Sequence, residues 1–242
     1  MAGHSKWANI KHRKGRQDAL RGKMNTKYIR EITVATKEAG ADPNANPRLR
    51  LAIDKANRAN VTKDSIKRAI DKGMGKLAGV DYQEVCYEGY GPNGIAMLVN
   101  CLTDNKNRTV AEIRHAFNKY GGNLGTDGSV RYLFVRKGVV VISGSVEDDA
   151  LLLWAIDSGI DNVSEGIHLG TVALEMAPNQ LAAVVDRLKT SGYTVVQADY
   201  LWIAEAKQIL DEATYEKYEV LYDVLLDLDD VQAVFSNAKV ET

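Results

Sequence analysis

Residues 3–14 concentrate side chains that hold phosphates and stack on bases. The segment reads Gly-His-Ser-Lys-Trp-Ala-Asn-Ile-Lys-His-Arg-Lys. Its apolar residues follow neither the period of a helix nor that of a strand, so packing does not account for it. Cations and hydrogen-bond donors contact phosphate oxygens, and an indole stacks on a base. We interpret the segment as an arm that binds nucleic acid and becomes ordered when it binds.

Charge is divided sharply along the chain. Residues 1–30 hold nine Lys or Arg and one acid, and residues 1–80 hold 19 Lys or Arg against 7 acids. Residues 81–242 hold 12 against 25, although the net charge of the whole chain is -1. Such a division indicates an anion-binding module joined to an acidic body. Nucleic acid is the leading candidate for the anion.

The predicted nucleic-acid contacts lie in the arm, on the helix after it and at one later helix start. They are His4, Lys6, Trp7, Lys11, His12, Arg13, Lys14, Arg16, Lys23, Lys27, Arg30 and Arg108. We expect the cations to neutralise phosphates, while Trp7 and His12 stack or wedge. A solvated face is the alternative for a charge run, but an exposed indole is costly without a partner. No metal site is expected at His4 and His12, because their spacing fits no metal motif.

Residues 16–39 are predicted to form one long helix. Its apolar stripe consists of Met24, Tyr28, Ile32, Ala35 and Ala39. Lys23, Lys27 and Arg30 lie on a face well away from that stripe, together with other cations at intervals of seven. We therefore expect these cations to point outward in a row and to extend the basic footprint of the arm. Two shorter helices, over 47–60 and 62–73, complete a three-helix bundle.

From residue 82 the periodicity becomes that of an α+β protein. The elements predicted up to residue 135 are strands over 82–89, 95–102 and 130–135 and a helix over 109–120. A strand-helix-strand-strand-helix-strand series follows over 139–203, which is the order of a ferredoxin-like unit. A last helix over 210–228 and a strand over 231–235 need a sheet to join.

The predicted fold class is α+β and multidomain. Residues 1–80 form the basic arm and the three-helix bundle. Residues 81–135 plus 204–242 form a discontinuous α+β domain, because the terminal helix and strand return most simply to the earlier sheet. Residues 136–203 form a ferredoxin-like domain inserted into that second domain.

Two further segments could contact an anion. In segment 103–109, where a strand ends and a helix begins, Lys106 and Arg108 would strengthen an anion site, whereas plain capping by Asp104 and the two Asn residues is the alternative. The glycine-rich segment 121–129 is not a P-loop, because no Gly-Lys-Ser/Thr follows it. It is either a mobile contact loop or a long turn.

Catalysis finds no support in the sequence. No nucleophile stands in a recognisable partner arrangement, so we expect no enzymatic activity, no cofactor and no small-molecule substrate. Four acids, Glu212, Glu216, Glu219 and Asp223, are expected along one exposed helical face.

Two cysteines and the absence of a long apolar run indicate the compartment. Cys86 is expected opposite Val99, so that it does not face Cys101, and both thiols are predicted to be free. No apolar run approaches the length of a membrane span. We predict a cytoplasmic protein that is a monomer or a weak oligomer and does not contact a membrane.

Several long strings resemble those of one known family. They are the segments 3–14, 42–50, 87–92, 104–112 and 121–125. In them the chain is similar to the YebC/PmpR family over most of residues 1–138, whereas residues 139–242 resemble it only in layout. Asn25 departs from the family, which usually has a large aromatic residue there, and it could mark a divergent second copy.

The resemblance implies three domains, the third inserted into the second, with no enzymatic activity and no cofactor. Family members are described as probable DNA-binding transcriptional regulators, and the mitochondrial relative and some bacterial members are tied to translation on the ribosome. We therefore predict a non-enzymatic nucleic-acid-binding regulator of gene expression that binds DNA. A translation factor bound to ribosomal RNA is the first alternative, since a basic, aromatic arm suits structured RNA. An adaptor whose basic arm docks on an acidic protein is the second.

Overall fold

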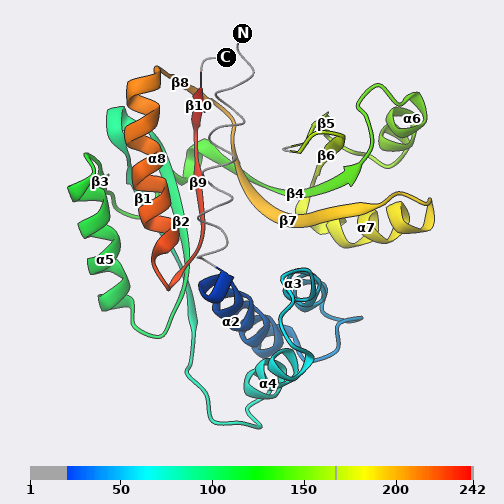
Figure 1. The fold of residues 1–242 in the computed structure, drawn as a ribbon, viewed down its shortest axis with the longest axis horizontal. Coiled ribbons are helices and arrows are strands. Elements are labelled where there is room, and N and C mark those ends of the chain that lie inside the picture. The colour runs from blue at the N-terminus through cyan, green and yellow to red at the C-terminus, as the bar shows by residue number, and fades with distance from the viewer. Residues whose placement is uncertain (1–20, 167, 241–242) are drawn as a thin grey trace. The chain divides into compact units, whose positions relative to one another are not determined.

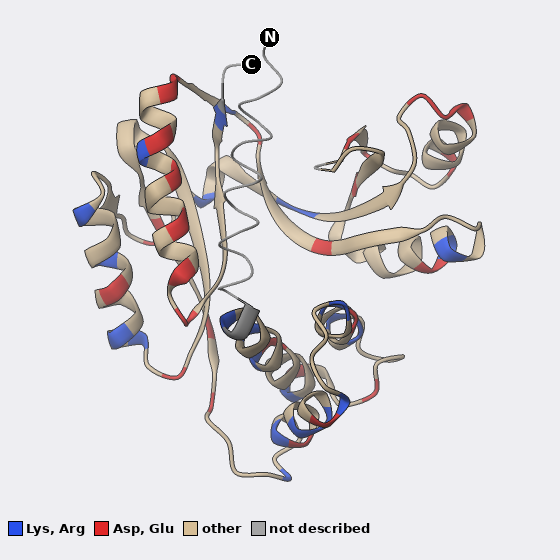
Figure 2. Cartoon of the chain, in the orientation of Figure 1, with Lys and Arg blue, Asp and Glu red and all other residues tan. Residues whose placement is uncertain are grey.

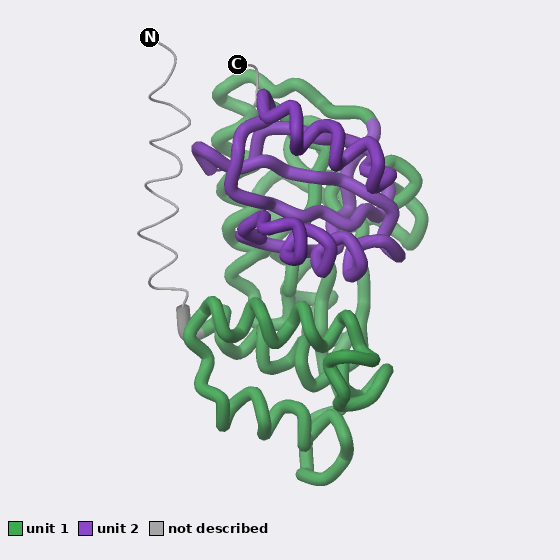
Figure 3. The backbone as a smooth tube through the Cα atoms, turned by 90° about the vertical axis from the view of Figure 1, so that its right-hand side faces the viewer, with its two compact units in different colours: residues 1–133, 206–242 green, residues 134–205 purple. Residues whose placement is uncertain are grey.

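The computed structural model describes residues 21–166 and 168–240 (Figure 1). The chain divides into two units, residues 1–133 with 206–242 and residues 134–205 (Figure 3). The second unit begins and ends within two residues of the insertion expected over 136–203. The separation of the helical bundle from the discontinuous α+β domain stays a prediction, because both belong to the first unit.

Three helices open the described chain, and polar side chains cap the N-termini of two of them. The helices are α2 (Arg21–Ala39), α3 (Pro47–Arg58) and α4 (Lys63–Gly73). The Asn46 side chain accepts from Leu49 N–H at 3.0 Å, and the Thr62 side chain accepts from Ser65 N–H at 3.2 Å. Their shared core consists of Ile32, Ala35, Leu49, Ala52, Ala56, Val61, Ile66 and Ala69. The predicted N-terminal three-helix arrangement is therefore confirmed for the described residues.

The faces of α2 differ from the prediction. Ile32 and Ala35 are buried as expected, but Met24 is 37% exposed and Ala39 is exposed. Lys27, predicted to point into solvent, is only 5% exposed. The helix is therefore covered on its cationic side as well as on its apolar side.

A four-stranded sheet lies in the first unit, with strand order β3-β1-β2-β9. The strands are β1 (Gln83–Tyr90), β2 (Ala96–Thr103), β3 (Asn123–Leu124) and β9 (Val231–Ser236). Helices α5 (Lys106–Lys119) and α8 (Glu212–Asp227) pack against it. The expectation that the terminal helix and strand return to this sheet is confirmed, since β9 pairs antiparallel with β2. A short parallel pair, β8 (Gln208–Leu210) with β10 (Ala238–Val240), completes the unit.

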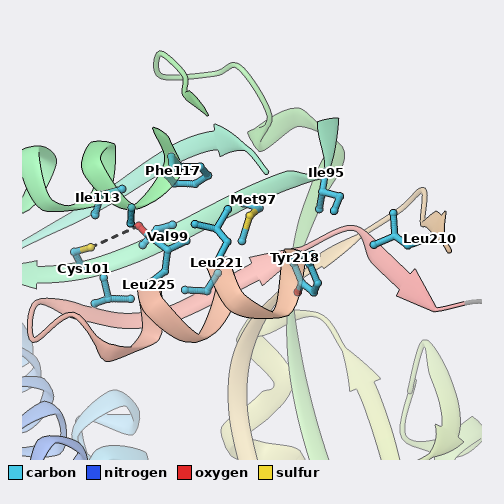
Figure 4. Close-up of a cluster of buried hydrophobic side chains, with 13 residues drawn as sticks. Ile95, Met97, Val99, Cys101, Ile113, Phe117, Leu210, Tyr218, Leu221 and Leu225 are labelled. Atoms are coloured by element: carbon cyan, nitrogen blue, oxygen red, sulfur yellow. Dashed lines mark hydrogen bonds between the residues drawn. The ribbon is translucent and has the colours of Figure 1, made fainter. Parts of the chain in front are cut away.

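The core of this sheet is built from alternate residues of β2 and from the apolar faces of the two helices. Figure 4 shows Met97, Val99 and Cys101 of β2 among side chains of α5 and α8. The helices contribute Ile113, Phe117, Tyr218, Leu221 and Leu225. This cluster is separate from the core of the helical bundle.

The register of β1 on β2 differs by one residue from the prediction. Cys86 pairs with Asn100, not with Val99. The cause is the turn between the strands, a 3-10 turn over Pro92–Gly94 with Asn93 at φ 56°, which sets Tyr90 opposite Ala96. Both cysteines are free, as predicted.

The second unit contains a sheet of order β5-β6-β4-β7 and two helices. Its elements are β4 (Phe134–Ser143), α6 (Asp149–Asp157), β5 (Asn162–Glu165), β6 (Thr171–Met176), α7 (Leu181–Thr190) and β7 (Val195–Ala204), with a 3-10 turn over Pro178–Gln180. The strand-helix-strand-strand-helix-strand order predicted from the sequence is thus observed.

One strand stands where two were expected. The predicted strand over 130–135 is a 3-10 turn at Arg131–Leu133, and β4 then runs from Phe134 through Gly138. Gly138 lies within this strand and does not interrupt it. A Cβ at this position would lie 3.0 Å from the Leu181 side chain. The lack of a side chain at Gly138 allows α7 to approach the strand.

A buried carboxylate fixes the glycine-rich segment. Glu88 on β1 is 4% exposed and accepts from the N–H groups of Gly128, Val130 and Arg131 at 2.8–2.9 Å. Burial acts to raise the pKa of Glu88, but these hydrogen bonds and the nearby guanidinium hold the pKa below its ordinary value. The Tyr90 hydroxyl also donates to Ser129 O at 2.8 Å. These bonds favour the interpretation of 121–129 as an anchored long turn.

Replacing Gly122 tests how closely this turn approaches β1. A Cβ at Gly122 would lie 2.4 Å from the Tyr90 carbonyl oxygen, so we expect Gly122→Ala to lower the free energy of unfolding by about 1–3 kcal/mol. Gly79→Ala is the matched control, because the nearest atom to its new Cβ would be 3.6 Å away. Urea denaturation of both variants gives the difference, and equal stabilities would contradict the close approach.

Candidate nucleic-acid interface

The predicted contacts of the arm, together with Arg16 just after it, lie outside the described residues. They are His4, Lys6, Trp7, Lys11, His12, Arg13, Lys14 and Arg16. Their part in binding stays a prediction. The other four predicted residues are described, and the structure brings them together.

The α2 cations converge on residues 226–230, which we name the acidic loop and which read Leu-Asp-Leu-Asp-Asp. Lys23 Nζ pairs with the Asp227 carboxylate at 2.9 Å. Lys27 Nζ donates to the Leu226 carbonyl at 2.7 Å. The predicted row therefore meets an acidic segment of the same unit, and the expectation that Lys27 points outward is wrong. Its physical reason is a partner about 200 residues away that no helical periodicity reveals.

Asp230 is the centre of this contact. It is 2% exposed, and its Oδ1 accepts from Arg30 Nη1 at 2.7 Å. Its Oδ2 accepts from Arg108 Nη2 at 2.7 Å, Thr109 Oγ1 at 2.7 Å and Thr103 Oγ1 at 3.0 Å. Burial acts to raise the pKa of Asp230, but these hydrogen bonds outweigh it and hold the pKa below its ordinary value.

Arg30 is held by several groups at once. Besides the Asp230 carboxylate, it donates to the Asp229 carbonyl at 2.8 Å. Its guanidinium also lies over the Tyr82 ring, 5.2 Å from the ring centroid. The expectation that Arg30 points freely into solvent is therefore wrong as well.

The start of α5 is capped by protein groups. The Asn105 side chain accepts from Arg108 N–H at 3.1 Å, and the Thr103 hydroxyl accepts from Asn105 N–H at 2.9 Å. Arg108 pairs with both Asp104 and Asp230 at 2.7 Å. The geometry thus favours capping over an anion site at this helix start, since the arginine already has two acidic partners.

Burial shifts the pKa of Lys27 in the opposite direction to the shift that an ordinary ion pair causes in a lysine. Burial lowers the pKa of Lys27 to about 8, although the charges of Asp227 and Asp229 act to raise it. The hydrogen bond of its ammonium goes to a neutral carbonyl. Lys27 is therefore a buried charge that is only partly compensated.

A cleft of about 500 Å³ opens beside this network, all of it within the first unit. The charged residues that line it are Lys23, Arg30, Asp104, Arg108, Glu112, Asp227, Asp229 and Asp230. Three cations against five acids give a negative surplus, which disfavours phosphate while the acidic loop is in place. Phosphate contacts by Lys23, Lys27, Arg30 and Arg108 stay a prediction.

Ionic contacts also connect the helical bundle to β1 and the segment before it. Arg48 on α3 pairs with Glu31 and Glu38 of α2 and with Glu84 of β1 at 2.7–3.0 Å. Lys37 of α2 pairs with Asp81. Charged groups thus join the bundle to the rest of its unit at several points.

The functional residues that sequence reasoning missed are the partners of the cations. Asp227 and Asp230 carry no motif, and only their clustering at the end of α8 distinguishes them. The acidic face expected on α8 is exposed at Glu212 and Glu216 but half-buried at Glu219 and Asp223. Asn25 is half-buried, and its Oδ1 has no hydrogen-bond partner within the described part of the chain.

Metal and membrane sites are not apparent in the part of the chain that the structure describes. No group of three or more His, Cys, Asp or Glu residues there is placed to hold a metal ion. None of the described helices combines the length and apolar character needed to cross a bilayer.

Family models match nearly the whole chain. Residues 5–76 match the TACO1/YebC protein N-terminal domain, and residues 82–238 match the TACO1/YebC second and third domain. The chain belongs to the TACO1/YebC family.

Relatives in this family are similar over their full length. A Methylococcus capsulatus protein is 57% identical over 99% of this chain and 96% of its own. A Pseudomonas fluorescens protein is 51% identical over the same shares, and both are named probable transcriptional regulatory proteins. The crystal structure of a conserved hypothetical protein from Aquifex aeolicus has 42% identity, a TM-score of 0.85 and 93% coverage of each chain. The TACO1/YebC fold, an N-terminal helical region followed by two β-sheet domains, is thus shared with a solved structure.

Neutralising Asp230 is expected to destabilise the first unit. Asp230→Asn keeps the shape but leaves two guanidinium groups without their buried partner, so the free energy of unfolding should fall by about 3–5 kcal/mol. Asp104→Asn, which removes a partly exposed partner of Arg108, should cost about 0–1 kcal/mol. Urea denaturation at neutral pH compares them, and a small loss in Asp230→Asn would contradict the central role of this carboxylate.

The difference in stability between wild type and Asp230→Asn is expected to depend on pH. The pKa of Asp230 is lowered from 3.8, so its stabilisation is complete above pH 3.8 and is lost as pH falls through the lower folded value. We expect the stability gap between wild type and Asp230→Asn to narrow below pH 3.8.

Replacing Lys27 by Met is expected to leave stability equal or higher. Met fills a similar volume without a desolvated charge, so the free energy of unfolding should not fall. Because burial lowers the pKa of Lys27 from 10.5 to about 8, its charge penalises the fold below pH 8. That penalty decreases as pH rises from about 8 towards 10.5. The free energy of unfolding of wild type should therefore rise relative to that of Lys27→Met over this interval. Lys23→Met, at a half-exposed position, is the control, and a fall of more than about 1 kcal/mol in Lys27→Met would count against a costly lysine.

Proposed function

We propose that this TACO1/YebC protein is a non-enzymatic nucleic-acid-binding regulator of gene expression. The observation that carries the proposal is the charge division, in which residues 1–80 carry 19 cations against 7 acids and the remainder is acidic. The names of its relatives, which describe probable transcriptional regulatory proteins, support it. DNA is the first candidate for the bound polymer.

The arm supplies the contacts in this proposal. Residues 1–30 contain a single acid, Asp18, whereas Lys23 and Arg30 of α2 pair with acids of the acidic loop. Five cations within residues 6–16 would each neutralise a phosphate, and Trp7 and His12 would stack on bases. They are Lys6, Lys11, Arg13, Lys14 and Arg16.

The rest of the molecule disfavours phosphate and so restricts binding to the N-terminal region. The second unit, residues 134–205, contains 4 Lys or Arg against 10 Asp or Glu. Figure 2 shows acidic bands along α8, whereas α3 and α4 carry many Lys and Arg. An acidic body lowers non-specific adhesion to a polyanion and orients the basic end towards it.

Ribosomal RNA is the second candidate, and one observation favours it. The cationic face of α2, the longest helix of the bundle, is covered by the acidic loop. In α4 the cations alternate with Asp64 and Asp71. In this conformation neither helix presents an uninterrupted row of cations to a DNA major groove. A basic, aromatic arm, by contrast, binds irregular RNA readily.

Salt dependence tests the electrostatic part of the proposal. With five phosphates neutralised, the log of the affinity should fall against log salt with a slope of about -4 to -5. Lys11→Ala/Arg13→Ala/Lys14→Ala should reduce the magnitude of this slope by about 3. Fluorescence anisotropy with labelled duplex DNA and a labelled RNA hairpin gives both slopes.

A matched control removes three exposed cations from the acidic part of the chain, as Lys207→Ala/Lys217→Ala/Lys239→Ala. It should leave the slope unchanged. A slope near zero in wild type, or equal losses in the two triple variants, would refute binding through the arm. Ultraviolet crosslinking in cells then separates the two polymers, since discrete genomic sites support transcription and clustered ribosomal RNA fragments support translation.

A further inference from the structure

We propose that the acidic loop competes with nucleic acid for the cations of α2, so that the protein carries its own substitute for a phosphate backbone. The inference rests on the proposed function and adds a means of regulating it. Closing the loop on α2 and binding phosphate with α2 are then mutually exclusive.

The loop presents oxygens to α2 much as a nucleic-acid backbone would. Lys23, Lys27 and Arg30 are spaced by four and three residues, so they share one face of the helix. Each donates to at least one oxygen of residues 226–230, over 2.7–3.1 Å. Two of these oxygens belong to the carboxylates of Asp227 and Asp230, and the others are the backbone carbonyls of Leu226, Asp227 and Asp229. A row of acceptors along one helical face is what a strand of phosphates also supplies.

The closed contact contains groups that it does not satisfy fully. The Lys27 ammonium is buried against a neutral carbonyl, which leaves much of the cost of its desolvation in place. Arg30 Nε is buried without a hydrogen-bond partner within the described residues. An apolar residue would fit the closed state at position 27 as well or better. A cation held there at a cost is useful if a second state exists in which it meets an anion.

The contact is also one that a polyanion can open. The bundle core and the sheet core are separate clusters, and ionic contacts connect the bundle to the sheet. At its edge, the Lys23 and Asp227 side chains are 44% and 56% exposed, and both line the cleft. Exposed ion pairs are weak and are screened by salt, so a phosphate strand held by the arm could displace Asp227 first.

Removing the exposed acids of the loop tests the competition. We will compare wild type with Asp227→Asn/Asp229→Asn, which leaves the structural Asp230 in place. The control, Glu212→Gln/Glu216→Gln, removes the same charge from exposed positions towards the other end of α8. Affinities for labelled duplex DNA and a labelled RNA hairpin are measured at low salt.

The loop variant is expected to bind about tenfold more tightly than wild type, because a larger fraction has α2 available. The control variant is expected to gain about twofold or less, through the general loss of negative charge. Equal gains in the two variants would overturn the competition while leaving the proposed function intact. If neither wild type nor the loop variant binds either polymer, the proposed function fails, and the competition fails with it.

Hydrogen exchange gives a second readout in the unaltered protein. The amide of Val231 donates to Leu228 O, and the amide of Leu102 donates to Asp230 O, so both report on the loop. Saturating nucleic acid should make these amides exchange several-fold faster, whereas amides in the core of α5 should not change. Tight binding with unchanged or slower exchange at Val231 and Leu102 would show that the loop stays closed, which overturns the inference.

Discussion

A single carboxylate, that of Asp230, joins α2 to the junction between β2 and α5, although both lie more than 100 residues before it in the chain. Arg30 approaches it from α2, Thr103 from the end of β2, and Arg108 and Thr109 from the start of α5. Because the group is buried, each donor is strongly held in place, and the loss of the acceptor would leave several of them unsatisfied. This one acceptor therefore ties the bundle to the sheet through side chains of α2, β2 and α5.

Local features of the fold could be predicted because their causes lie within a few residues. Asn46 and Thr62 satisfy amides three residues ahead of them, and alternation or helical spacing identifies most strands and helices. The element order of residues 134–205 follows from the same periodicities. The continuity of β4 through Gly138 was not predicted, because the close approach of Leu181 that this glycine allows comes from a distant segment.

Only the cations of the candidate site could be predicted from the sequence, and their acidic partners could not. A helical wheel identifies the face on which Lys23, Lys27 and Arg30 lie, but not what covers that face. Their partners are separated from them by about 200 residues, and an Asp in a short acidic run has no periodicity to mark it. The role of Glu88 could not be predicted for the same reason, because the amides that it binds lie some 40 residues away. Long-range polar partners are the part of a structure that single-sequence patterns record least.

The order of α2 and the acidic loop along the chain has a consequence for biosynthesis. Lys23, Lys27 and Arg30 are made about 200 residues before Asp227 and Asp230. Strand β9, which completes the first sheet, follows directly after Asp230. A nascent chain therefore has these cations uncovered, beside an RNA-rich machine, until residues 226–230 have also been made. Only then does α2 acquire its internal partner.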